Sequence, residues 1–92
     1  MLLIKDILDQ KPIGTSHSIK GWVRTFRSNR FIALSDGSTI RTLQAVVDFE
    51  KFDEALLKRI TTGAALAISG DLVSSQGKGQ DVELLVESLE VL

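Results

Sequence analysis

The spacing of hydrophobic positions changes twice along the chain and predicts a mostly β domain. Residues 3–9 carry Leu and Ile along one stripe of a short helix, and Pro12 follows its end. From residue 18 onward apolar and polar positions alternate with a period of two, which predicts five strands, at residues 18–27, 31–35, 42–48, 64–73 and 81–92. Helical spacing returns once, between the third and fourth strands, and predicts a helix over residues 52–60.

Turn residues separate these elements. Residues 28–30 and the Asp36-Gly37-Ser38 run predict two turns, residues 74–79 a looser one, and Gly21 a bend or bulge in the first strand. The resulting order, a short helix followed by β-β-β-α-β-β, is that of the OB-fold, an all-β, five-stranded Greek-key barrel. We expect the helix over 52–60 to plug one end of this barrel. The ligand surface of such a barrel is the face of its second and third strands.

The composition excludes several kinds of catalytic and metal site. The chain has 92 residues, enough for a single domain over residues 1–92 but not for a deep pocket, and it has no cysteine and one histidine. These counts exclude a disulfide scaffold, a thiolate metal site, a cysteine nucleophile and a metal site built on two histidines. His17, between elements, is more typical of an exposed turn than of a general base. We therefore predict no catalytic residue and no metal site.

The acidic pair of Asp53 and Glu54 has an ordinary structural explanation. Asp53 and Glu54 would lie in the first turn of the helix over 52–60, and Lys58 and Arg59 in its last turn. Helix ends prefer this arrangement, because acidic side chains cap the N-terminus and basic ones complement the C-terminus.

Charge is unevenly distributed. The formal net charge is −1, yet residues 18–47 hold five basic residues and one acidic residue, a local net charge of +4. The remaining residues hold six basic and eleven acidic side chains, a net charge of −5. A near-neutral total therefore does not exclude a polyanionic partner, because a basic patch can be local.

Basic, aromatic and amide side chains converge in this stretch. Arg24, Arg27 and Arg30 surround the first turn, while Phe31 and Gln44 have the parity opposite to the core positions of their strands. If the second and third strands pair as a hairpin, Phe31 and Gln44 share a face. An aromatic ring stacks on unpaired bases, a glutamine amide can read a base edge, and arginines neutralise phosphates. The structural alternatives are a core Phe31, a solvated Gln44 and solubilising arginines. Trp22, with apolar neighbours, is expected in the core or at its edge.

Three segments occur in order along the chain: GWVRTFR at 21–27, FIALSDGS at 31–38 and LQAVVD at 43–48. In these segments, and over residues 3–92 as a whole, the chain resembles the N-terminal anticodon-binding domain of class IIb aminoacyl-tRNA synthetases. It is most similar to the asparaginyl members of bacterial type, and the aspartyl members are the nearest competitor.

The resemblance implies roles for individual residues. Phe31 matches the aromatic residue that stacks on the central anticodon base, a uridine, and Gln44 matches the glutamine that hydrogen-bonds that uridine. Arg24 and Arg27 match basic positions near the anticodon. Glu83 matches an acidic position that contacts the first anticodon base.

The resemblance also implies what surrounds the domain. We expect the chain to be part of a longer, cytoplasmic, homodimeric synthetase whose catalytic domain uses ATP and Mg²⁺, and we expect no cofactor in residues 1–92. The partner would be the anticodon loop of a tRNA, with no membrane involved. A stand-alone single-strand nucleic-acid binder of the same fold and a protein-docking module remain alternatives.

Overall fold

The computed structural model describes residues 3–75 and 81–92. Within these ranges the chain forms α1 (Ile4–Gln10), β1 (Ser16–Arg27), β2 (Phe31–Ser35), β3 (Leu43–Val46), α2 (Glu54–Leu57), β4 (Ala65–Ser74) and β5 (Val82–Val91). Every predicted strand is present: β2 has the predicted bounds, and the ends of the other strands differ from the prediction by at most two residues. Most of the loop predicted over 74–79 lies outside the described residues.

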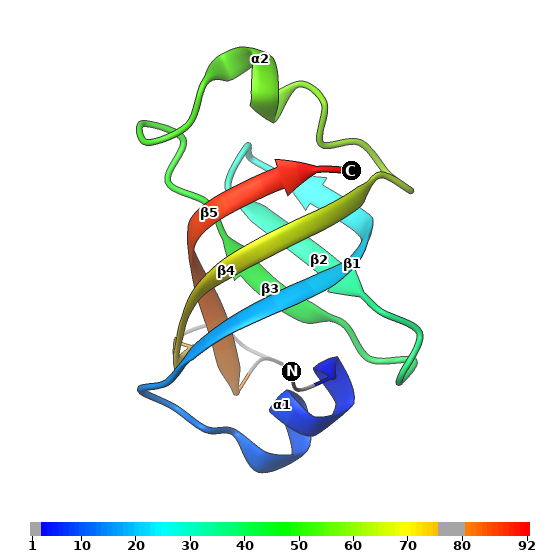
Figure 1. Cartoon of the computed structure of the whole chain (residues 1–92), viewed down its shortest axis with the longest axis vertical. Coiled ribbons are helices and arrows are strands. Elements are labelled where there is room, and N and C mark those ends of the chain that lie inside the picture. Colours follow the sequence, from blue (N-terminus) through cyan, green and yellow to red (C-terminus); the bar gives the residue numbers. More distant parts are fainter. Residues whose placement is uncertain (1–2, 76–80) are drawn as a thin grey trace.

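The five strands close into a barrel in the order β1-β2-β3-β5-β4 (Figure 1). Neighbouring strands are antiparallel, except that β3 and β5 run parallel. The chain order and the barrel order therefore differ where β5 inserts between β3 and β4. This closed barrel confirms the predicted five-stranded OB-fold.

Alternate residues of the strands fill the barrel. The side chains without exposed surface on its strands include Ile32, Leu34, Leu43, Ala45, Leu66, Leu72 and Leu84. Burying each large aliphatic side chain contributes about 1.5–3 kcal/mol to folding, so the period-two pattern is also the main source of stability. The residues between these core positions point outward and form the surface considered below.

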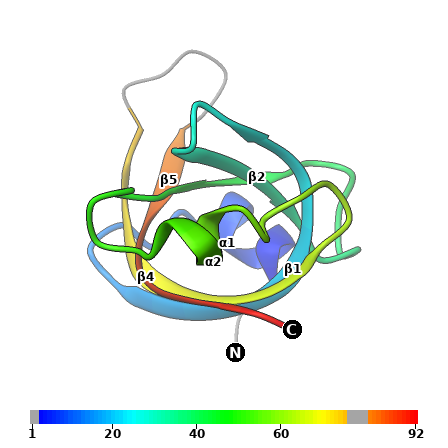
Figure 2. The same cartoon turned by 90° about the horizontal axis from the view of Figure 1, so that it is seen from above.

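A helix covers each end of the barrel. Figure 1 shows α2 beyond one end and α1 beyond the other, and Figure 2 shows α2 lying across the opening. Leu57 of α2 and the following Ile60 are buried, as are Ile4 and Ile7 of α1, and all four belong to the barrel core. The prediction that the helix after the third strand plugs one end is confirmed, and α1 closes the other end.

The helix at the α2 end is shorter than predicted. The pattern over 52–60 indicated a longer helix, but α2 covers only Glu54–Leu57. Beyond Leu57 the amides of Arg59 and Ile60 donate to carbonyls three residues earlier, at 3.0 and 3.1 Å, which is the tighter 3₁₀ pattern that ends helices. Lys58 is the C-cap and not a last-turn residue. Asp53 caps the N-terminus as predicted, because its carboxylate accepts the Ala55 N–H at 3.3 Å.

The turn after β2 holds α1 in place. The Ile4 N–H donates to Asp36 Oδ2 at 2.9 Å, and the Lys5 N–H donates to Ser38 Oγ at 3.0 Å. Asp36 Oδ1 also accepts the Ser38 N–H at 2.9 Å. Residues 36–38 therefore form the predicted turn and also cap a helix more than thirty positions away in the chain.

Two predictions for the first strand are wrong. His17 lies within β1, opposite Gly70, and its Nε2 is 2.6 Å from Thr15 Oγ1. Gly21 is not the bulge, because the pairing of β1 with β2 shifts register between Val23 and Thr25. Gly21 instead allows close approach of the two strands: a Cβ at this position would lie 2.5 Å from the carbonyl oxygen of Ser35.

Candidate nucleic-acid interface

Two rows of side chains cross the outside of β1, β2, β3 and β5. The strand pairing places Thr25, Ala33, Gln44 and Glu83 in one row, and Arg27, Phe31, Val46 and Leu85 in the next. We call these eight residues the outer face. Gln44 and Phe31 are diagonal neighbours on it, a relation that separates residues by about 7–8 Å. The structure thus brings together Phe31 and Gln44, and also Glu83, which the sequence placed in the last strand.

A bulge in β1 brings Arg24 and Arg27 to the same side. Strict alternation from the buried Val23 would point Thr25 and Arg27 into the barrel. Because Arg24 is an extra residue between the Val23 and Thr25 pairings, the parity changes, and both Thr25 and Arg27 are exposed. Arg24, exposed at the bulge, and Arg27, beside Phe31, therefore both project from the outside of the sheet.

The turn between β1 and β2 adds the third arginine. Ser28 and Asn29 have positive φ angles of 57° and 52°, which turn the chain sharply, and the Arg30 N–H donates to the Arg27 carbonyl at 3.0 Å. The Arg30 guanidinium carbon lies 5.7 Å from the centre of the Phe31 ring, within cation–π range. A planar group that stacks on Phe31 would therefore lie close to a positive charge.

The first row contains a hydrogen bond between side chains. Gln44 Nε2 donates to Glu83 Oε2 at 2.9 Å, and Ser75 Oγ donates to the same oxygen at 3.4 Å. Gln44 and Glu83 are adjacent because β3 and β5 pair in parallel at these positions. Both side chains are half-buried, so a ligand on the outer face can reach them.

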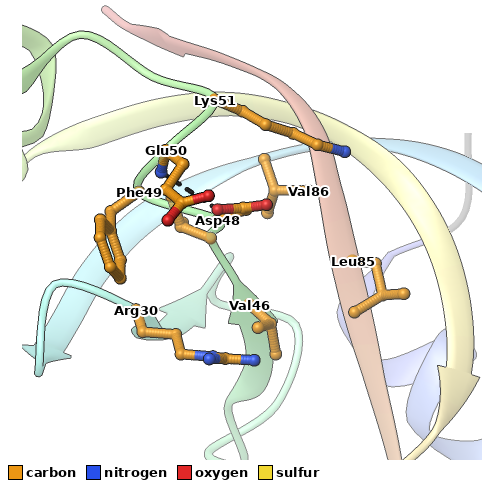
Figure 3. Close-up of a pocket in the computed structure, with 9 residues that line it drawn as sticks. Arg30, Val46, Asp48, Phe49, Glu50, Lys51, Leu85 and Val86 are labelled. Carbon is orange, nitrogen blue, oxygen red and sulfur yellow. Dashed lines mark hydrogen bonds between the residues drawn. The ribbon is translucent and has the colours of Figure 1, made fainter.

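An open pocket lies beside the end of the second row that Val46 and Leu85 form. Its volume is about 470 Å³, and it lies between Arg30, the residues from Val46 to Lys51, and Leu85 with Val86. Figure 3 shows Phe49 on one side of this pocket and Leu85 on the other. Phe49 and Leu85 are 54% and 42% exposed, large values for apolar side chains. The carboxylates of Asp48 and Glu50 and the basic side chains of Arg30 and Lys51 also line it, so the pocket combines an apolar surface with both hydrogen-bond donors and acceptors.

Comparison with known proteins shows the family of this domain. Residues 17–92 match the family model of the OB-fold nucleic acid binding domain named for the tRNA anticodon. The chain belongs to this family. It is 54% identical over 94 residues to the asparagine–tRNA ligase of Cytophaga hutchinsonii and 48% identical over 92 residues to that of Phocaeicola vulgatus. Each alignment covers 97% of this chain and 20% of the ligase, so the chain spans about a fifth of these relatives.

A solved structure of a synthetase contains a domain with the same fold. The asparaginyl-tRNA synthetase of Entamoeba histolytica superposes with a TM-score of 0.71 and 25% sequence identity, over 86% of this chain and 21% of that one. The family model begins at residue 17 and leaves out α1, although Ile4 and Ile7 belong to the same core as the strands. In this OB-fold domain the N-terminal helix is thus a structural part of the barrel.

Trp22 is another feature of this OB-fold domain, and the prediction that places it in the core or at its edge is wrong. It lies on β1 opposite Ser35, on the outside of the sheet, and is 42% exposed. Its ring covers the turn at Gly37, where an added Cβ would lie 3.3 Å from Trp22 Cη2. Apolar neighbours in the sequence do not decide burial here, because alternate strand residues point to opposite sides.

The four arginines of residues 18–47 divide into two groups. Arg41 is bound to α1: its Nη2 lies 2.8 Å from Asp9 Oδ1, and this hydrogen bond holds the pKa of the Asp9 carboxyl below its usual range. Within the described residues Arg24, Arg27 and Arg30 form no ion pair. Their charges are therefore available to a polyanion beside the outer face. No helix in the same residues is long and apolar enough to cross a membrane.

Proposed function

We propose that this chain is the anticodon-binding domain of an asparagine–tRNA ligase, and that its outer face binds the unstacked bases of the anticodon loop. The observation that supports this is the placement of Phe31 and Gln44 as diagonal neighbours, with Arg24 and Arg27 on the same side of the sheet. The 48–54% identity to asparagine–tRNA ligases favours the asparaginyl over the aspartyl type.

Each side chain of this group suits a different part of a single-stranded loop. The Phe31 ring stacks on the central base, a uridine, which is worth about 1–3 kcal/mol per base. The Gln44 amide hydrogen-bonds the edge of the same base. Arg24 and Arg27 neutralise backbone phosphates, and Arg30, close to the Phe31 ring, adds positive charge where the stacked base would lie.

The parent protein would perform the chemistry. We propose that it is a cytoplasmic homodimer whose catalytic domain joins asparagine to its tRNA with ATP and Mg²⁺. Residues 1–92 would contribute tRNA recognition and hold neither the nucleotide nor the metal.

The Phe31→Ala variant tests the stacking role. We expect it to bind an anticodon stem-loop with central uridine about 5- to 150-fold more weakly than the wild type, the equivalent of one lost base stack. Fluorescence anisotropy with a labelled stem-loop measures the dissociation constants. Phe31→Leu is the matched control for ring stacking, because it keeps an apolar side chain on the outer face and should still lose most of the affinity.

The same titration separates the alternatives. A stem-loop of identical composition with a scrambled loop should bind more weakly to the wild type. Equal binding of both loops with a steep salt dependence would replace the proposal by a general single-strand binder. Unchanged affinity of Phe31→Ala for the matched loop would remove the outer face as the binding site.

A further inference from the structure

We propose that Glu83 is a positioning residue that fixes the orientation of the Gln44 amide, and thereby makes the outer face select uracil over cytosine at the central anticodon base. This inference rests on the proposed function, because it concerns how the same face distinguishes two pyrimidines. It gives Glu83 a role through Gln44, beside the direct contact with the first anticodon base that the family resemblance implies.

The contact between the two side chains allows one amide orientation. Gln44 Nε2 lies 2.9 Å from Glu83 Oε2. A carboxylate accepts hydrogen bonds and donates none, so it holds the NH₂ group of the amide and repels its carbonyl oxygen. Rotating the Gln44 amide by half a turn would place two acceptor oxygens against each other. In the part of the chain that the structure describes, the Gln44 carbonyl oxygen has no hydrogen-bond partner, so it remains for a ligand.

The two pyrimidines differ in the order of their edge groups. Uracil presents the O4 acceptor beside the N3–H donor, whereas cytosine presents the N4 donor beside the N3 acceptor. A glutamine amide offers one donor beside one acceptor. An amide that turns freely therefore matches either base, and an amide held in one orientation matches only one of them. With uridine as the proposed ligand, the Glu83 contact is what excludes cytosine.

The position of Glu83 also needs an explanation. An acidic side chain on a surface that binds RNA repels phosphates and lowers affinity. It is nevertheless half-buried at the end of the first row, where it pairs with Gln44 of β3 on one side and Val73 of β4 on the other. Ser75 Oγ, 3.4 Å from the same Oε2, restrains the carboxylate further. A positioning role accounts for a negative charge that electrostatics alone would disfavour here.

The Glu83→Gln variant tests this inference because it keeps the shape of the side chain and removes its preference for one amide orientation. A glutamine can donate to the Gln44 carbonyl oxygen as well as accept from its NH₂ group. Dissociation constants are measured for two anticodon stem-loops that differ only in uridine or cytosine at the central position. We expect the wild type to prefer uridine at least about fivefold, the lower value for a bidentate base contact, and the variant to lose most of this preference.

Two controls separate positioning from other roles. Glu87→Gln makes the same charge change on β5 at an exposed residue outside the two rows, and should leave the ratio of the two affinities unchanged. In a Gln44→Ala background, Glu83→Gln should not alter the ratio further, because the residue that it positions is gone. A second pair of stem-loops that differ at the first anticodon base tests the alternative role.

Each outcome decides a different claim. An unchanged central-base ratio in Glu83→Gln, or an altered ratio in the Gln44→Ala background, overturns the positioning role. A change confined to the first-base pair shows that Glu83 contacts that base directly and also overturns it. If the wild type itself prefers neither the anticodon loop over a scrambled one nor uridine over cytosine, the proposed function fails, and the failure is visible without any variant.

Discussion

Replacing Asp36 by alanine should loosen the attachment of α1 to the barrel. The Asp36 carboxylate uses both oxygens: Oδ2 accepts the Ile4 N–H at 2.9 Å, and Oδ1 accepts the Ser38 N–H at 2.9 Å and its hydroxyl at 2.5 Å. Ile4 is fully buried, so water cannot easily take over the lost bond at the start of the helix. The substitution therefore removes a helix cap and a turn-stabilising contact together.

The expected loss follows from these contacts. Removing an N-cap acceptor costs about 0.5–2 kcal/mol, and the second contact places Asp36→Ala near the upper value. For a domain of this size, each 1 kcal/mol lowers the melting temperature by about 4–8 °C, so we expect a decrease of about 8–16 °C. Thermal unfolding followed by circular dichroism measures it. Asp36→Asn, which keeps one acceptor oxygen, should give an intermediate value.

The matched control is the cap of the other helix. Asp53 accepts the Ala55 N–H at 3.3 Å, a longer bond at an exposed position of a four-residue helix. Asp53→Ala should therefore cost less than Asp36→Ala. Equal melting temperatures of Asp36→Ala and the wild type, or equal losses in the two alanine variants, would refute the role of Asp36 in holding α1.

The pH dependence gives a second check on Asp36. Burial disfavours its charged form, but the hydrogen bonds from the Ile4 amide and from Ser38 outweigh burial and hold the pKa of the carboxyl below its usual value of 3.8. A lowered pKa contributes stability that is complete above pH 3.8 and is lost as the pH falls through the pKa of the folded state. The stability difference between wild type and Asp36→Ala should therefore be constant near neutral pH and shrink in acid.

Two further substitutions test the packing of the barrel. Ile7→Ala should lower the free energy of unfolding by about 2–5 kcal/mol in a denaturant titration, because Ile7 is fully buried under the barrel, whereas Ile40→Ala, at 99% exposure, should leave it unchanged. Gly70→Ala would place a Cβ 2.0 Å from the Leu85 carbonyl oxygen and should cost about 3 kcal/mol or more in the same titration. Gly63→Ala, where φ is positive but the space is open, should cost about 1 kcal/mol. A small loss in Ile7→Ala would show that α1 does not seal the core, and similar losses in the two glycine variants would show that strand separation does not depend on Gly70.

Much of the fold follows from the sequence because its signals are local. Period-two alternation predicted all five strands, with β2 at the observed bounds, and the strand and helix order indicated the OB-fold. Charge counts located the arginines near the first turn. Parity within single strands was also enough to put Phe31 and Gln44 on the same side of the β2–β3 hairpin. Each of these properties depends on residues close together in the chain.

Other features were decided by contacts between distant segments. The bulge at Arg24 moves Arg27 from the inside to the outside of the sheet. The sequence of β1 does not predict this bulge, because a bulge is defined by the pairing with β2. Apolar neighbours suggested that Trp22 lies in the core or at its edge, but its side chain lies on the outside of the closed sheet. The helical pattern over 52–60 predicted a longer helix than the single turn that forms. After this turn the chain tightens into a 3₁₀ segment, and Ile60 packs into the core from that segment.

The sequence by itself determined the elements, their order and the side of the hairpin on which Phe31 and Gln44 lie, because side-chain periodicity is a local property of strands and helices. Only the tertiary structure decided what surrounds them. Parallel pairing of β3 with β5 places Glu83 beside Gln44, 39 positions away in the chain, and closure of the barrel brings Asp36 to the first turn of α1. These contacts depend on which strand edges meet, and local periodicity does not specify that choice.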